Sequence, residues 1–412
     1  MPSRAQAEVS ILEILRSTLW LGLVGFGGGV SVLGLIGHLA VERRRWLTER
    51  EFTNTATIAQ MLPGGAAANA LAHIGLRLRG LPGAIAAYTG FILPGALMIL
   101  ALAWAYVRFG VAPSAEVVLS GLNAAVVGIV AALTLRMVRA GVGRLWQMGV
   151  AFAALLLSLE GGAGSGEIAL LGVFAGLVVD LLQKRARLAR LRRAPRAPSP
   201  PVALPDEGEP LKRLGAERDD DPPSLPAAWP VGLVGQVGAG SLLALGLLFF
   251  RTGLGAYGGG FAIVPSLHAA AVTGGWISER QFASAVAVGK LTPGPVLLMA
   301  TFIGYVAHGL AGALVATFTI FAAPFGLVVS LGSWLLRMRS RRVVRAALRG
   351  LTPAVVGLMA AAAVTLGTSM RGPADVAVSV VTLLTLSRFA TNPVAVLLVA
   401  GVARYLLSLG GV

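Results

Sequence analysis

The chain has 412 residues, of which 56% are hydrophobic and 13% are charged, and its mean hydropathy is +0.79. Soluble globular proteins carry about 25% charged residues, so this composition excludes an ordinary soluble domain and indicates a polytopic membrane protein. The 34 Lys and Arg residues outnumber the 18 Asp and Glu residues, but they fall in short clusters between apolar runs, which is typical of membrane topology rather than of nucleic-acid binding. The absence of cysteine excludes disulfides, thiolate metal sites and cysteine nucleophiles.

An apolar run near 9–25 opens the chain. It has no small-residue cleavage pattern and leads directly into the next segment, so it is predicted to be a membrane helix and not a removable signal peptide. Glu13 and Arg16 lie three residues apart in this run, a spacing that favours a structural pair on one side of the helix.

The polar stretch 42–51 is expected to lie outside the hydrocarbon. Within it, Thr48 and Glu51 have the spacing of a capping box, which predicts that a helix begins there. Ser278 and Gln281 repeat the same box in the second half of the chain.

Several of the following apolar segments reach the roughly 17–25 residues that cross a bilayer. They lie near 52–76 (broken at Pro63-Gly64-Gly65), 82–107, 117–135, 146–160, 166–183, 231–250, 254–272, 283–306, 310–335, 351–369, 374–387 and 393–409. Residues 184–230 are rich in Arg, Pro and acidic residues, so they are predicted to be a disordered cytoplasmic linker. We therefore expect an all-α membrane protein with about 10–13 membrane segments, organised as a first membrane repeat (1–183), the linker (184–230) and a second repeat (231–412).

The two halves repeat each other at a nearly constant offset, which indicates an internal duplication. The matching positions are Trp46 and Trp276, His38 and His268, Pro63 and Pro293, Pro94 and Pro324, and the segments 126–128 and 355–357. The clusters of arginine change sides between the copies: 337–349 is Arg-rich and its counterpart 108–116 is not, whereas 136–145 is Arg-rich and its counterpart near 371–375 is not. By the positive-inside rule, this predicts inverted-topology repeats with a substrate site between them, and a segment 52–76 that enters and returns without crossing.

Glycine triplets and Pro-Gly steps lie at equivalent places in apolar sequence. Phe26-Gly27-Gly28-Gly29 corresponds to Tyr257-Gly258-Gly259-Gly260, and Gln60-Met61-Leu62-Pro63-Gly64 corresponds to Lys290-Leu291-Thr292-Pro293-Gly294. Both kinds of step interrupt helices, and a membrane helix is broken only where protein or water satisfies the freed backbone groups. The breaks are therefore expected to line a cavity.

These motifs resemble those of the chromate ion transporter family in its two-domain form. The matching motifs are Phe26-Gly27-Gly28, Trp46-Leu47 followed by Phe52, Tyr257-Gly258-Gly259-Gly260 and Thr292-Pro293-Gly294-Pro295. The chain departs from the family pattern at Gly29, Gly65 and Lys290. The resemblance covers roughly 10–180 and 232–409 and implies a multi-pass transporter of chromate or sulfate-like oxyanions in the inner (plasma) membrane, associated with efflux and chromate resistance.

On this reading the broken helices bind the anion. Half-helix N-termini offer unpaired N–H groups and a partial positive charge, Thr292 offers a hydroxyl and Lys290 offers a full charge. The candidate substrate-binding residues are Phe26, Gly27, Gly28, Gly29, Gln60, Pro63, Gly64, Tyr257, Gly258, Gly259, Gly260, Lys290, Thr292, Pro293, Gly294 and Pro295.

Other interpretations stay open. Close helix packing alone is the alternative interpretation of the glycines at 27–29 and 258–260, and snorkelling to an interface is the alternative for Lys290. His38 and His268 are either structural residues or sites of proton coupling. The chain carries no enzyme motif, so neither catalysis nor a cofactor or metal is expected, and a passive anion channel or a membrane scaffold is the alternative to a transporter. The expected partners are the oxyanion and the lipid bilayer without nucleic acid, and homodimer formation is left open.

Overall fold

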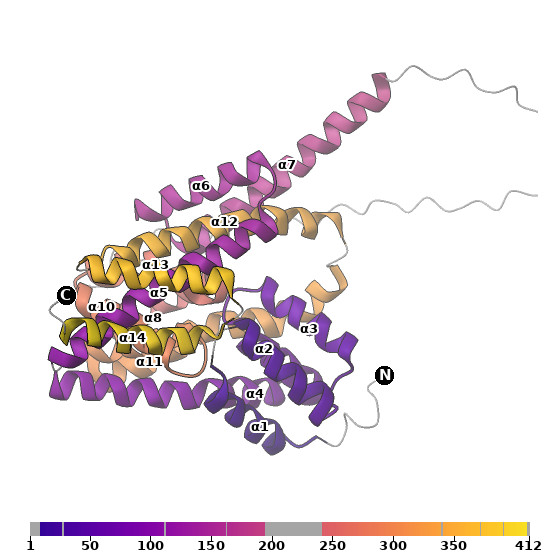
Figure 1. Ribbon diagram of the computed structural model, residues 1–412. Helices are drawn as coiled ribbons and strands as arrows, with labels where there is room; N and C mark the ends of the chain where they lie inside the picture. The colour runs from indigo at the N-terminus through magenta and orange to yellow at the C-terminus, as the bar shows by residue number, and fades with distance from the viewer. Residues whose placement is uncertain are drawn as a thin grey trace, which may run out of the picture.

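The computed structural model describes residues 9–26, 29–110, 113–161, 163–193, 241–338, 341–370, 372–389 and 391–409. Within these ranges all regular secondary structure is helical (Figure 1). Five helices are long and apolar enough to cross a membrane, and four shorter apolar helices accompany them. The prediction of an all-α polytopic membrane protein is thus confirmed.

The described helices of the first half are α1 (Ile11–Val24), α2 (Gly29–Gly37), the π-helix η2 (His38–Arg43), α3 (Glu49–Met61), α4 (Ala66–Phe109), α5 (Pro113–Gly141), α6 (Leu145–Leu159) and α7 (Ser165–Arg193). Those of the second half are α8 (Leu242–Leu254), η3 (Gly258–Ile263), α9 (Val264–His268), η4 (Ala269–Thr273), α10 (Glu279–Leu291), η5 (Val296–Leu298), α11 (Met299–Met338), α12 (Arg342–Gly367), α13 (Pro373–Arg388) and α14 (Pro393–Leu409). The segment 254–272, expected to be one span, is therefore divided into short 3-10, α and π turns, because three glycines and Pro265 interrupt the regular helix.

Both predicted capping boxes are confirmed. Thr48 accepts a hydrogen bond from the Glu51 backbone and the Glu51 carboxylate accepts one from the Thr48 N–H, and Ser278 and Gln281 form the same pair of bonds. Since each box satisfies backbone donors that a helix start leaves free, it fixes the first residue of α3 and of α10.

The two Pro-Gly breaks have the same backbone geometry. Gly64 and Gly294 adopt φ of +106° and +108°, a region that side-chain-bearing residues rarely enter. α3 ends two residues before Pro63 and α10 two residues before Pro293, as the residue that precedes a proline disfavours helix. The predicted interruptions at these sites are confirmed.

The repeat extends to the kinks of the two longest helices. α4 bends at Arg79-Gly80, where Gly80 has φ +62°, and α11 bends at His308-Gly309, where Gly309 has φ +60°. The bends lie close to the gaps that the sequence predicts between its apolar segments. The two halves are therefore homologous in structure as well as in sequence.

These equivalent long helices run in opposite directions. Three contacts give their relative order: His73 with Gly332, Tyr88 with Phe325, and Tyr106 with Phe302. Residues later in α4 contact residues earlier in α11, so the two helices are antiparallel.

The helices form two bundles, and each bundle takes helices from both halves of the chain (Figure 1). We call the first the core bundle (α1–α4 and α8–α11) and the second the outer bundle (α5–α7 and α12–α14). The core bundle is centred on the packing of α4 against α11, and the outer bundle on the packing of α5 and α12. Neither bundle is formed by one half alone.

The contacts between the bundles are unequal. On the core side they come from elements of the second half: α10 packs against α5 and α14, η3 and α9 pack against α12, α9 reaches α6, and α8 reaches α7. Among the described residues, the equivalent α1–α3 of the first half make no interface of comparable extent with the outer bundle. One end of the boundary between the bundles is thus packed more closely than the other.

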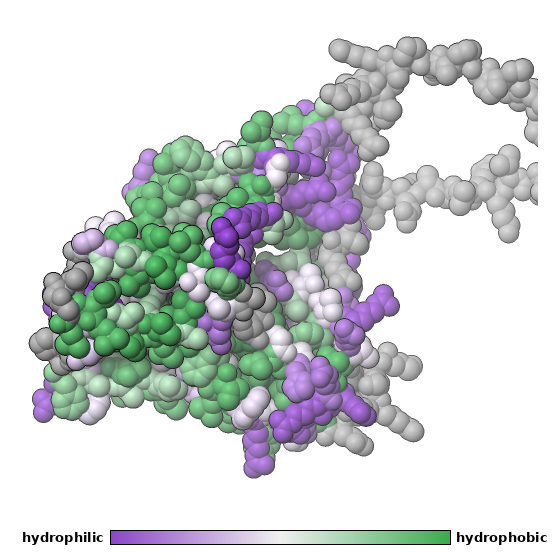
Figure 2. All heavy atoms as spheres, in the orientation of Figure 1, coloured by the Kyte–Doolittle hydropathy of each residue, from purple (hydrophilic) through white to green (hydrophobic). Residues whose placement is uncertain are grey.

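Polar residues collect at the ends of the bundles and apolar residues cover their flanks (Figure 2). Hydrophilic side chains gather where α7 ends and α12 begins, and again around α1–α3. This distribution is that of a protein whose sides face lipid and whose ends face water.

Two expectations need correction. Glu13 pairs with Arg44 at 3.1 Å instead of with Arg16, because the turn after η2 folds back over α1. α7 continues through residues 184–193, which the composition predicts to be linker; their Lys, Arg, Leu and Ala residues are strong helix formers. Residues 194–240, the rest of the predicted linker and the start of the predicted span 231–250, lie outside the described residues.

Candidate functional site

The Pro-Gly breaks of the two halves meet at the centre of the core bundle. The Gly64 N–H donates to the Ala256 carbonyl at 2.7 Å, and the Gly294 N–H donates to the Gly25 carbonyl at 3.1 Å. Each break therefore binds the residue just before the aromatic-glycine motif of the other half. The structure thus brings the two Pro-Gly breaks together with Gly25 and Ala256, which precede the two aromatic-glycine motifs. We call this place the crossing.

Close packing holds this crossing together. A Cβ placed on Gly65 would lie 3.1 Å from the Cβ of Pro295, so the two breaks are in direct contact. A Cβ on Gly95 would meet the carbonyl of Pro293 and a Cβ on Gly64 would lie 2.6 Å from Pro324, which shows how closely each break approaches the long helix of the other half. Gly64 is thus closely packed against the other half of the chain.

The hydrogen bonds of the crossing limit which groups remain for a ligand. The Gly64 and Gly294 amides, expected to contribute to an anion cradle, already donate to protein carbonyls. The Thr292 hydroxyl donates to the Val288 carbonyl at 3.0 Å. An anion at this place must therefore be met by other donors.

Lys290 is the strongest such donor. Its side chain comes from the last turn of α10 and is 6% exposed, so it does not snorkel to the surface of the molecule. Within the described part of the chain its ammonium group forms no hydrogen bond or ion pair, and it lies 5.1 Å from the centroid of the Phe261 ring, just after the second glycine triplet. Its counterpart Gln60 is exposed. The two halves thus supply different side chains at this position, one inside and one outside.

The glycine motifs contribute backbone shape. Gly258–Gly260 open η3, and Gly260 adopts φ +93° with the Leu297 side chain only 2.6 Å from where its Cβ would lie. Gly29 opens α2, whereas Gly27 and Gly28 lie outside the described residues. Tyr257 is half-buried against the small cluster around Ala262, and Phe26 is exposed.

The equivalent histidines each pair with a glutamate; the His38 pair is exposed, whereas the His268 side chain is mostly buried. His38 contacts Glu42 at 2.8 Å and His268 contacts Glu279 at 2.8 Å. His73 lies inside the core bundle, 3.3 Å from the Thr55 hydroxyl. Nothing in the described part of the chain groups three or more metal-ligating side chains.

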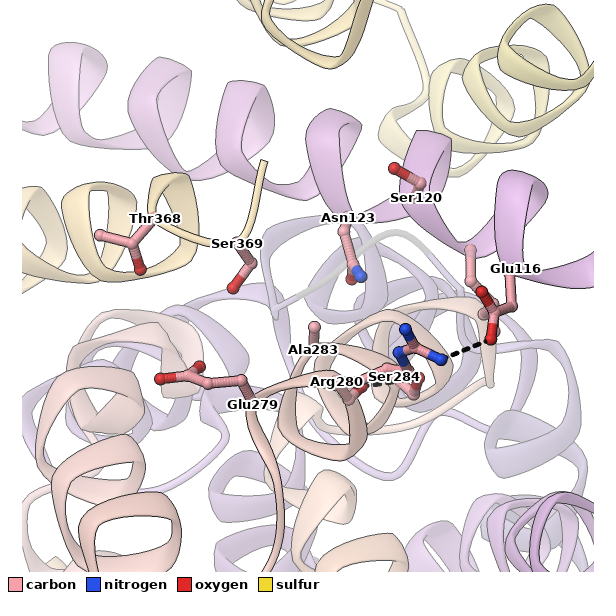
Figure 3. Close-up of a pocket in the computed structure, with 10 residues that line it drawn as sticks. Glu116, Ser120, Asn123, Glu279, Arg280, Ala283, Ser284, Thr368 and Ser369 are labelled. Atoms are coloured by element: carbon pink, nitrogen blue, oxygen red, sulfur yellow. Dashed lines mark hydrogen bonds and ion pairs between the residues drawn. The ribbon is translucent and has the colours of Figure 1, made fainter. Parts of the chain in front are cut away.

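The sequence reasoning did not single out a polar cavity between the bundles (Figure 3). It has a volume of about 340 Å³ and lies among the first turns of α5, the first turns of α10 and the end of α12. Its lining residues are Glu116, Leu119, Ser120, Asn123, Glu279, Arg280, Ala283, Ser284, Thr368 and Ser369. Across it, the Arg280 guanidinium donates to the Glu116 carboxylate at 2.8 Å. The sequence contains a signal for this pair, namely a difference in charge between the repeats. Glu116 corresponds to Arg345, and Arg280 corresponds to Arg50, so only the Glu116–Arg280 pair has opposite charges.

Comparison with known proteins assigns the chain to a family. The profile of the chromate transporter family matches residues 12–179 and 243–405. The chain is 30% identical to a chromate transport protein of Cupriavidus metallidurans over 92% of this chain and 87% of that protein. It is 31% identical to a probable chromate transport protein of Synechococcus elongatus over 87% of this chain and 85% of that protein, and 28% identical to a chromate transport protein of Pseudomonas aeruginosa over 87% and 81%.

No solved structure matches the chain. The family match covers both halves of the chain and stops on either side of the linker, as the sequence motifs predict. The chain belongs to the chromate transporter family.

Proposed function

We propose that this chain carries chromate, or a sulfate-like oxyanion, across the inner (plasma) membrane by alternating access between two inverted repeats. The substrate site on this proposal is the crossing of the two Pro-Gly breaks, with Lys290 as the charge that meets the anion. Support for the substrate comes from the names of the relatives, three of which are chromate or probable chromate transport proteins.

One observation carries the proposal: Lys290 is buried with no anionic partner among the described residues. Transferring an ammonium group from water into a protein interior costs on the order of several kcal/mol. The contact of Lys290 with the Phe261 ring offsets only a part of this cost. A charge kept inside a membrane protein at such a cost is expected to act on a substrate or an ion. An inorganic oxyanion supplies the missing partner.

Two features support inverted repeats. The equivalent helices α4 and α11 run in opposite directions. The equivalent helices α3 and α10 also begin at opposite ends of α4. α3 begins near the first part of α4, where Glu51 pairs with Arg77 at 2.6 Å, whereas α10 begins near the start of α5, just after the last residue of α4. By the positive-inside rule, the Arg-rich end where α3 and α12 begin is cytoplasmic, and the end with the Glu116–Arg280 pair is external.

The test is transport by the purified chain in liposomes. We expect labelled chromate or sulfate to accumulate against its gradient when an ion gradient is imposed. A passive channel only equilibrates the anion, and a scaffold moves none, so either result overturns the proposal. Imposing proton and sodium gradients in turn identifies the coupling ion.

The residue-level test uses the two counterparts as a matched pair. Lys290→Ala is expected to weaken oxyanion binding by roughly thirtyfold, the value of a hydrogen bond to a charged group of about 2 kcal/mol. Gln60→Ala, at the equivalent but exposed position, is expected to leave binding within about twofold. Equal affinity for the Lys290→Ala variant and the natural chain, measured by calorimetry, contradicts the proposed site.

A further inference from the structure

We propose that Glu116 and Arg280 form a gate at the α5–α10 end of the pathway, and that the cavity they span is a second binding site for the oxyanion. When the gate opens, Arg280 exchanges the Glu116 carboxylate for the substrate. This inference rests on the proposed function, because it assigns a further station to the same anion.

The position of the pair favours a gate. Glu116 lies in the first turn of α5, in the outer bundle, and Arg280 lies in the first turn of α10, in the core bundle. Their 2.8 Å ion pair therefore connects the two bodies whose relative motion would open and close the pathway. The two side chains are 31% and 58% exposed, so water and ions reach the pair and it can be broken at small cost.

The cavity has the chemistry of an oxyanion site. Apart from the carboxylates of Glu116 and Glu279, its polar lining consists of hydroxyl and amide groups (Figure 3). The hydroxyls of Ser120, Ser284 and Thr368 already donate to the Asp375 carboxylate and to the Arg280 and Thr365 carbonyls. Beside Arg280, the side chains of Asn123 and Ser369 are therefore the donors of the cavity best placed to meet an anion. Arg280 has five N–H donors and a geometry that matches an oxyanion as well as it matches a carboxylate. The anion and Glu116 are thus competitors for one guanidinium group.

The cavity also lies on the same face of α10 as Lys290. Ala283 lines the cavity, and Lys290 follows it by seven residues, which is nearly two full helical turns. At 1.5 Å per residue the distance along the helix is about 10 Å. One face of α10 therefore carries both the proposed gate and the buried Lys290.

The equivalent residues at the opposite end of the molecule have like charges, and this difference accounts for closure at the α5–α10 end. By the repeat, Glu116 and Arg280 correspond to Arg345 and Arg50, two exposed residues of like charge. These cannot form an ion pair with each other, and α3 makes no interface with α12 comparable to that of α10 with α5. The ion pair therefore closes only the α5–α10 end, and the structure is that of a transporter shut at this end.

The first experiment compares the two neutralised variants. Glu116→Gln releases Arg280 and is expected to tighten chromate or sulfate binding by about two- to fivefold, the value of an exposed ion pair, whereas Arg280→Gln is expected to weaken it by a similar factor. Asp180→Asn and Arg342→Gln are the controls, because this 2.8 Å pair lies wholly within the outer bundle; both are expected to bind as the natural chain does. Affinity is measured on the full-length protein by calorimetry.

Opposite signs separate the proposal from a merely structural pair. If Glu116→Gln and Arg280→Gln change the affinity in the same direction, or not at all, the second site is wrong. Failure of the natural chain to bind either anion instead contradicts the proposed function, so the two failures are distinguishable.

The second experiment uses the natural absence of cysteine. Glu116→Cys with Arg280→Cys, joined by a short reducible cross-linker, is expected to reduce transport at least tenfold, and a reductant is expected to restore it. The same cross-link between Asp180→Cys and Arg342→Cys is expected to leave transport unchanged, because it joins residues of one bundle. Full transport by the cross-linked gate variant, with the cross-link verified by mass spectrometry, overturns the gate.

Discussion

The two halves of this chain share a backbone and differ in the charges that they carry at equivalent places. The breaks, the capping boxes and the kinks of the long helices repeat closely, down to φ values of +106° and +108° at the two Pro-Gly steps. Some side chains at equivalent positions differ. Gln60 is exposed whereas its counterpart Lys290 is buried, and Glu116 has the oppositely charged Arg345 as its counterpart. The duplication thus repeats the architecture, and on the proposed function the differences in charge supply the chemistry.

The largest expected effect tests the two breaks as structural elements. Gly64→Ala is expected to lower the free energy of unfolding by roughly 3 kcal/mol, since a positive φ costs about 1–2 kcal/mol and overpacking costs about 1–3 kcal/mol. Its Cβ would lie 2.6 Å from Pro324, a rigid neighbour. Gly294→Ala has the same φ but meets only the end of the Leu298 side chain at 3.0 Å, so a loss of about 1–2 kcal/mol is expected.

Thermal unfolding of the purified variants measures this difference. Gly34→Ala is the control, because a Cβ at this helical position meets nothing within 4 Å. Equal destabilisation by Gly64→Ala and Gly294→Ala would mean that the two breaks are interchangeable in packing.

The next effect concerns the two ends of the pathway. Arg345→Glu introduces a carboxylate at the position that corresponds to Glu116, and Arg50 is the counterpart of Arg280. On the proposed alternating access, these two residues would approach each other when the second end of the pathway closes. A second ion-pair gate is expected to slow transport by about two- to fivefold at low salt and less at high salt. The double variant Arg50→Glu, Arg345→Glu again has like charges, so its turnover is expected to return toward that of the natural chain. Equal slowing of both variants would show that the charge itself, and not the pairing, is responsible.

The smallest expected effect is a pH dependence of stability that the Thr48–Glu51 capping box contributes and the Ser278–Gln281 box does not. The Thr48 N–H, which donates to Glu51, lowers the pKa of that carboxyl below its ordinary value of 4.5, and Arg77 acts in the same direction. A depressed pKa in the folded state stabilises the protein above the unfolded value, and this contribution is lost as the pH falls through the folded pKa. The Ser278–Gln281 box does not titrate in this range.

Glu51→Gln is therefore expected to lower stability at pH 7 by about 0.5 kcal/mol, the charge contribution at a helix start. Below the folded pKa the variant and the natural chain are expected to unfold at the same temperature. The corresponding change Gln281→Glu is expected to introduce the pH dependence into the second half. A difference for Glu51→Gln that persists unchanged in acid would contradict this assignment.

Local signals made much of the fold predictable. Capping boxes, Pro-Gly steps and apolar lengths are properties of short stretches, so the starts of α3 and α10 and the interruptions near Pro63 and Pro293 follow from the sequence. The composition of 184–193 predicts a linker and therefore an earlier end of α7, but the residues of this stretch favour helix and α7 continues to Arg193.

Partners in space were less predictable. Glu13 binds Arg44, which is 31 residues away, instead of Arg16 on its own helix, because the turn after η2 returns to α1. The crossing of the breaks required residues about 190 positions apart to meet, as Gly64 and Ala256 do. The sequence also placed Lys290 and Gln60 at equivalent sites, and only the packing around α10 distinguishes the buried side chain from the exposed one.

The exchange of helices between the bundles has a consequence for the integrity of the chain. A polypeptide severed between residues 193 and 241 would still need both fragments to complete either bundle, because α4 rests on α11 and α5 on α12. Each fragment alone would leave those faces without a counterpart, so co-expressed fragments should copurify, and a lone fragment should be degraded or self-associate. We therefore expect mutual dependence of the fragments, rather than covalent continuity, to hold the two bundles together.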